Sequence, residues 1–247
     1  MDGDPFLERR TALQGRSWRR YSYRGDDPAS YADIFDLEAG GTGDDAEDFK
    51  PLFGLLSFLN DSDDATFNAE LAKHVDVPQF GVYTAMMDVI SNSDNISGPG
   101  NNAYLYIGPD SEQFTVVPWD MNLAFGGMGG MRGPADENGG PITFPANTEG
   151  IPEINGTPVA GESFQRGVGG PGGFGTNILV TRSETYPGFT DLVASETTRL
   201  RSELYESGKA AEILARWVDL LKSQASDLVS EETITSESES ISQQFTW

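Results

Sequence analysis

The feature that most limits how this chain can fold is a long stretch rich in glycine and proline, residues 126–176. It contains the runs GGMGGMRGPADENGGP and GVGGPGGFG and holds most of the chain's glycines. Because glycine loses more backbone freedom on folding than any other residue, such a stretch is costly to order. We therefore predict a mobile, disordered insert at residues 126–176, between two segments that fold.

The segment before this insert carries the periodic apolar residues of helices. In DAEDFKPLFGLLSFLN, which starts at Asp45, phenylalanine and leucine recur at helical spacing and predict a first helix. The segment ATFNAELAKHV predicts a second. A third helix is expected from VDVPQF, where Asp76 suits the N-cap and Pro78 the first turn.

Strand-like segments follow the third helix after a polar loop, SNSDNISGPGNN. The segments AYLYI and QFTVVPW are joined by GPDSE, and this pattern predicts a β-hairpin. Two further helices are expected after the insert, roughly at Pro187–Glu206 and Lys209–Val229, and the serine-rich and glutamate-rich end of the chain reads as a polar tail. The expected fold class is α+β, a small antiparallel hairpin with surrounding helices.

Composition excludes several classes of function. The chain has 39 acidic and 16 basic residues and a formal net charge of −23, so nucleic acid is not an expected partner. It contains no cysteine and a single histidine, His74, which rules out disulfides and multi-histidine metal sites. No stretch is long and apolar enough for a membrane span, and Met1 is followed by DGDPFLERR, so no export signal is expected in this chain.

Polar side chains gather at the ends of the predicted hairpin and of the helix before it. We expect these loops to bring Asn92, Asp94, Asn102 and Asp120 into one neighbourhood. Phosphoryl transfer requires side chains of these types, because one carboxylate orients the acceptor hydroxyl while another, with amide oxygens, holds Mg²⁺ against the phosphates. One Asp and one or two Asn satisfy magnesium, since water and substrate fill its other positions.

At these residues the sequence resembles the CotH kinase family, the spore-coat-type protein kinases of atypical kinase-like fold. The resemblance covers most of residues 20–230 and includes YRGDDPASYADIFDLEAG upstream and NILVTR downstream. Its core motifs are VDVPQF at residues 75–80, NSD at 92–94, NAYLY at 102–106 and PWDMNLAFG at 118–126.

The resemblance implies an atypical protein kinase that transfers the γ-phosphoryl group of ATP, with Mg²⁺ or Mn²⁺, to Ser or Thr of a coat or surface protein. It implies that Asp94 is the catalytic carboxylate and that Asn92, Asn102 and Asp120 bind the nucleotide. The implied metal ligands are Asp120, Asn102 and Asn122. It also implies an extracellular, cell-surface or spore-surface location.

Under the same resemblance the chain divides into five parts. Residues 1–44 are expected to be a connector or the remnant of an N-terminal lobe, most of which this chain would lack. The other four parts are the catalytic core at 45–125, the insert at 126–176, the C-terminal helices at 177–230 and the polar tail at 231–247.

Other interpretations of these residues stay open. The family pattern W-D-x-D has Asn122 in place of its second acid, which favours a non-catalytic surface or coat module as the main alternative. Asp94 and Asp120 also suit ordinary turns. The segment NDSDD at residues 60–64 could form a calcium-binding loop, which would make this a calcium-stabilised protein, although it lacks the glycine and later glutamate of an EF-hand.

Overall fold

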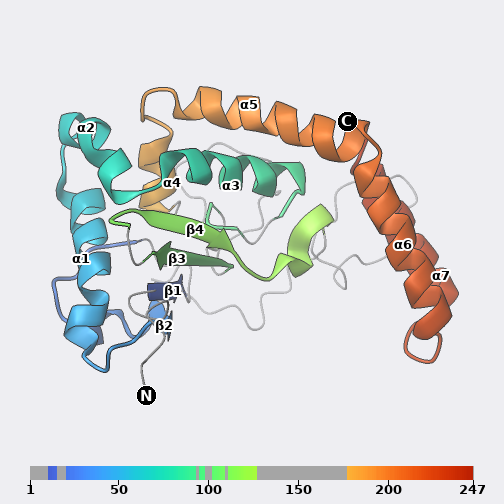
Figure 1. The fold of residues 1–247 in the computed structure, drawn as a ribbon, viewed down its shortest axis with the longest axis horizontal. Coiled ribbons are helices and arrows are strands. Elements are labelled where there is room, and N and C mark those ends of the chain that lie inside the picture. Colours follow the sequence, from blue (N-terminus) through green and yellow to red (C-terminus); the bar gives the residue numbers. More distant parts are fainter. Residues whose placement is uncertain are drawn as a thin grey trace, which may run out of the picture.

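The structure is a computed structural model and describes residues 11–15 (backbone only), 21–92, 95–97, 102–108, 111–126 and 177–246. The described residues form one antiparallel sheet and a set of helices, so the predicted α+β class is confirmed (Figure 1). The predicted insert lies almost wholly outside the described residues, and so does Asp94.

Four strands make up the sheet, in the order β2-β1-β3-β4. They are β1 (Thr11–Gly15), β2 (Phe35–Ala39), β3 (Ala103–Ile107) and β4 (Phe114–Pro118), and every neighbouring pair is antiparallel. The predicted hairpin is confirmed as β3–β4. It is only half of the sheet, however, because the region before residue 45 supplies β1 and β2, two five-residue strands whose pairing a local pattern does not reveal.

Helix α3 (Val77–Val89) covers the sheet and begins as the sequence predicts. The Asp76 side chain accepts a hydrogen bond from the Gln79 N–H, and Pro78 stands in the first turn. The helix start is also tied to β4, because Asp76 N–H donates to the Phe114 carbonyl at 2.9 Å and Gln79 Nε2 donates to the Val116 carbonyl at 2.7 Å. These bonds fix α3 relative to the hairpin.

Two acidic N-caps start the helices that precede α3. Asp44 caps α1 (Asp45–Asp61) and Asp63 caps α2 (Asp64–His74) by accepting backbone N–H groups of the first turn. Apolar residues on α1 and α2 face the sheet and α3 and form the main core. Its largest fully buried side chains are Tyr31, Ile34, Phe35, Leu52, Leu55, Leu56, Leu59, Phe67, Leu71, Phe80 and Ile96.

Helix α4 (Ile178–Ser183) follows residue 176 directly and is anchored to the first two helices. Its Arg182 donates through Nη1 to the Leu59 carbonyl at 2.8 Å and to Ser62 Oγ at 2.9 Å. The guanidinium also lies 4.2 Å from the centre of the Phe67 ring, a cation–π contact. The chain therefore re-enters the core at a defined place after the insert.

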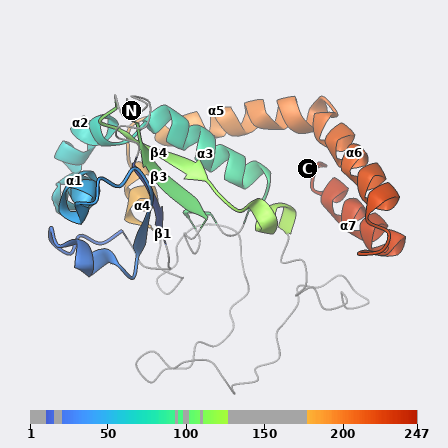
Figure 2. The same cartoon turned by 60° about the horizontal axis from the view of Figure 1, so that its bottom comes forward.

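The remaining helices run away from the sheet. Helix α5 (Phe189–Arg201) lies along α3 and continues through a π-helical turn, η3 (Ser202–Glu206), to α6 (Lys209–Gln224) and α7 (Glu231–Gln243). The two helices predicted after the insert are thus confirmed as α5 and α6. Figures 1 and 2 both show α6 and α7 side by side beyond the far end of α5.

Helix α7 occupies most of the segment read from the sequence as a polar tail. Ser230 caps it by accepting the Thr233 N–H, and Ile234 is its one buried residue. The serine-rich and glutamate-rich run has little apolar periodicity of its own, so packing against α6 is what orders it. Within the described residues, no helix is long and apolar enough to cross a membrane.

Candidate active site

Two backbone segments meet at the open end of the β3–β4 hairpin. Asn102 precedes β3 and Asp120 follows β4, and antiparallel pairing of Ala103 with Pro118 brings them to the same end. The Trp119 N–H donates to the Asn102 carbonyl at 3.1 Å, and Asn102 Nδ2 donates to the Asp120 carbonyl at 3.1 Å. These two hydrogen bonds, here named the hairpin clasp, close the end of the hairpin.

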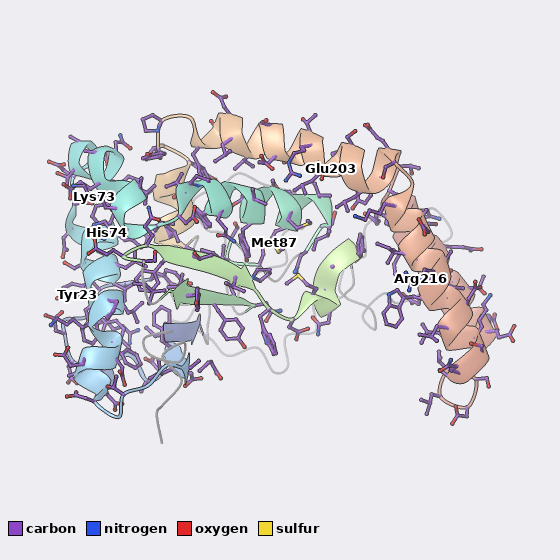
Figure 3. All side chains as sticks on the ribbon, viewed as in Figure 1. Tyr23, Lys73, His74, Met87, Glu203 and Arg216 are labelled. Carbon is purple, nitrogen blue, oxygen red and sulfur yellow. The ribbon has the colours of Figure 1, made fainter. Side chains whose placement is uncertain are left out.

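The end of α3 lies against the same segment. Asn92, which is only 3% exposed, donates through Nδ2 to the sulfur of Met121 at 3.2 Å and toward the sulfur of Met87 at 3.7 Å. Figure 3 shows Met87 on the side of α3 that faces the sheet. The loop after α3 and the segment after β4 are therefore in direct contact. Of the four residues expected in one neighbourhood, Asn102 contacts Asp120, Asn92 contacts the neighbouring Met121, and Asp94 lies outside the described residues.

Among the residues that the structure describes, three other than glycine adopt left-handed backbone conformations, and all three lie in these two segments. Their φ angles are 50° for Ser91, 43° for Asp120 and 58° for Phe125. Such values cost roughly 1–2 kcal/mol for a residue with a Cβ atom and concentrate at functional sites. The Phe125 N–H donates to the Ile90 carbonyl at 2.5 Å, so the strained segments also support each other.

The Asp120 side chain is exposed, whereas its backbone carbonyl is held by the hairpin clasp. Its Oδ1 accepts a long hydrogen bond of 3.3 Å from the Asn122 N–H. This contact is the turn-closing bond that aspartate often makes two residues ahead, so the turn interpretation of Asp120 also fits the geometry. A carboxylate on a fixed backbone, open to solvent, is at the same time suited to bind a cation.

The other predicted site residues differ in exposure. Asn92 and Asn102 are buried, and the hydrogen bonds of their Nδ2 atoms hold loops together. Asn122 is an exposed residue close to Asp120 in the chain. No group of three or more His, Cys, Asp or Glu side chains is placed to hold a metal ion among the described residues, which do not include Asp94.

Sequence reasoning missed two residues that shape the site. Met121 accepts the Asn92 bond through its sulfur, and Trp119 stands beside Asp120 with 51% of its surface exposed. The Trp119 ring meets the Tyr104 ring edge-on, with centroids 5.4 Å apart. Trp119 carried a signal, because it belongs to the W-D motif. Met121 carried none, since a thioether acceptor has no sequence signature.

Residues 18–233 match the family model described as CotH kinase protein, and this match includes every segment of the site. The chain belongs to the CotH kinase protein family. No curated protein matches it. In this CotH family member the matched region extends from before β2 to the first turn of α7, so it includes β2, β3, β4, the hairpin clasp and the helices up to α6, while β1 and most of α7 lie outside it.

Proposed function

We propose that this protein is a CotH-like protein kinase with a kinase-like C-terminal lobe. It transfers the γ-phosphoryl group of ATP to a Ser or Thr hydroxyl of a coat or surface protein and uses Mg²⁺ or Mn²⁺. Family membership supports the kinase class. The observation that carries the site assignment is the hairpin clasp, which fixes the backbone of Asp120 while its carboxylate stays open to solvent.

Asp120 and Asn122 are the residues that suit a divalent metal. Both are exposed, and they lie two residues apart on one turn. Magnesium takes few protein ligands, because water and phosphate oxygens complete its six positions. When bound, the ion neutralises charge on the phosphates during transfer. Asn102 supports this site from behind, because its side chain holds the Asp120 carbonyl.

Asp94 is proposed as the catalytic carboxylate on the family resemblance alone, since it lies outside the described residues. In the reaction the acceptor oxygen bonds to the γ-phosphorus, the bond from that phosphorus to the leaving ADP oxygen breaks, and the hydroxyl proton goes to the carboxylate. Asn92, two residues earlier in the chain, is bonded to Met121. Asn92 therefore lies directly beside the segment that carries Asp120.

Metal-dependent nucleotide binding and phosphate incorporation test this proposal. We expect ATP to raise the melting temperature only with Mg²⁺ or Mn²⁺ present, since a ligand of the folded state stabilises it. Radiolabelled phosphate should pass from γ-labelled ATP to the chain or to Ser- and Thr-containing peptides. Asp120→Asn should abolish both effects at an unchanged melting temperature of the free protein. Undiminished transfer by Asp120→Asn would show that the metal site is assigned wrongly.

The second candidate is a non-catalytic coat or surface module that keeps the family fold. It is favoured by Asn122, which removes one negative charge from the W-D-x-D pattern and so weakens the attraction for a cation. This candidate predicts no thermal shift with ATP and Mg²⁺. Stabilisation by Ca²⁺ without any effect of nucleotide would instead indicate a calcium-stabilised protein.

A further inference from the structure

An aromatic contact joins the far end of the chain to the site segment. Phe245, just after α7, meets the Phe125 ring edge-on, with centroids 5.9 Å apart and an interplanar angle of 75°. It also stacks on Tyr205 of η3, with centroids 5.0 Å apart and an angle of 25°. The helical arm of α6 and α7 therefore returns its end to the segment that carries Asp120.

The partners of Phe245 are themselves bonded to the last turn of α3. Tyr205 donates its hydroxyl to the Val89 carbonyl at 2.6 Å, and the Phe125 N–H donates to the neighbouring Ile90 carbonyl at 2.5 Å. Both bonds are accepted by carbonyls at the C-terminus of a helix, where no N–H group of the helix itself is left to donate to them. The three rings thus occupy a defined place between α3, η3 and the site segment.

Phe125 ends a segment that a small number of bonds hold in a strained conformation. The short helix η2 (Met121–Gly126) is broken at Ala124 and Phe125, and both Asp120 and Phe125 have positive φ. A bulky residue with positive φ persists only where its surroundings enforce that conformation. The Phe245 ring covers the Phe125 side chain and supplies such an enforcing contact.

We propose that Phe245, Tyr205 and Phe125 form an aromatic latch that holds η2, and through it Asp120, in the conformation that binds metal. Phe245 and Tyr205 are positioning residues, since they act on the metal ligand through Phe125. The inference rests on the proposed function for its catalytic meaning. The coupling of Phe245 to residues 119–126 does not depend on that function.

Phe245→Ala tests the latch, with Gln243→Ala as the matched control at an exposed position two residues earlier. We expect the Mg²⁺ concentration for half-maximal stabilisation by ATP to rise about three- to tenfold in Phe245→Ala. This fold-change corresponds to the interaction free energy of one aromatic pair. Gln243→Ala should leave it unchanged. Phe245→Leu, which keeps apolar bulk, should restore part of the effect. A purely structural role would lower the melting temperature of the free protein and leave the Mg²⁺ midpoint in place.

Hydrogen exchange separates failure of the latch from failure of the proposed function. Phe245→Ala should speed amide exchange in residues 119–126 and leave exchange in β3 and α2 as in the unaltered protein. If the unaltered protein shows no metal-dependent ATP binding but the exchange effect is present, the kinase proposal fails and the latch stands as a structural device. If exchange in residues 119–126 is the same in both proteins, the latch is refuted.

Discussion

Asn102 Nδ2 lies 3.1 Å from the backbone carbonyl oxygen of Asp120, although the two residues flank different strands. This bond supports the backbone of Asp120 in a left-handed conformation, φ 43°, without engaging its carboxylate. One residue therefore holds the backbone of the site in place, and the other supplies the group that can bind a ligand. The buried asparagine fixes the turn, and the exposed aspartate remains available to a ligand.

Removing the Asn102 side chain should destabilise the whole hairpin end. Asn102→Ala leaves the Asp120 carbonyl without its side-chain donor, and we expect the free energy of unfolding to fall by about 1–3 kcal/mol. Urea denaturation measures the change. Asn122→Ala is the control, because this exposed residue of the same segment should alter stability by less than about 0.5 kcal/mol. Equal effects of the two substitutions would contradict a supporting role for Asn102.

Two substitutions at Asp120 distinguish the role of its negative charge from the role of its backbone conformation. Asparagine tolerates left-handed φ well, so Asp120→Asn should keep the melting temperature and lose the ATP response that depends on Mg²⁺. Asp120→Ala should lose the same response and also cost about 1 kcal/mol of stability through backbone strain. Calorimetry with and without ATP and Mg²⁺ distinguishes the two. An ATP response that survives in Asp120→Asn would remove this carboxylate from the metal site.

Local patterns in the sequence were sufficient for several parts of the fold. The cap at Asp76 and the proline at the first turn predict the start of α3, because both act within one helical turn. The hairpin is predictable because its strands are close in sequence and alternate in burial. Its antiparallel register then requires Asn102 and Asp120 to meet, which is why part of the site could be inferred before the structure.

The parts that could not be predicted depend on long-range pairing or on backbone angles. Strand β1 reads as an irregular segment, because it is ordered by pairing with both β2 and β3. The contact between Phe245 and Phe125 joins elements that no periodicity connects. Positive φ at Ser91 and Phe125 has no signature in residue type, since such angles are expected mainly at glycine.

His74, the chain's one histidine, should give stability a pH dependence. Burial lowers its pKa from the ordinary 6.5, and its ring stacks on Phe58 with centroids 4.0 Å apart. A lowered pKa means that the unfolded chain binds the proton more readily, so stability is full above 6.5 and is lost as pH falls below that value. Between about pH 7.5 and about pH 5.5, the melting temperature of the unaltered protein should fall more than that of His74→Gln. If the melting temperatures of the two proteins fall by the same amount over this pH range, His74 has the same pKa in the folded and the unfolded chain.

The contact between α3 and α5 depends on a glycine. A Cβ atom at Gly81 would lie 2.5 Å from Leu192 Cδ2 and 2.7 Å from Leu192 Cγ, so the two helices approach more closely there than alanine allows. Gly81→Ala should therefore lower the free energy of unfolding by about 1–3 kcal/mol, as overpacking does elsewhere. Gly54→Ala is the matched control within α1, where a Cβ atom meets nothing within 4 Å and alanine should stabilise the helix by about 0.5–1 kcal/mol.

Because Asn92 follows the end of α3 by three residues, a shift of this helix should also reach the site. Gly81→Ala should weaken ATP binding with Mg²⁺ more than a destabilised variant elsewhere, such as Arg182→Ala, which loosens α4 from α1 and α2. Denaturation gives the stability change of each variant, and ATP titration at fixed Mg²⁺ gives the affinity. If the two variants lose affinity only in proportion to stability, the packing of α5 on α3 serves the fold and has no separate influence on the site.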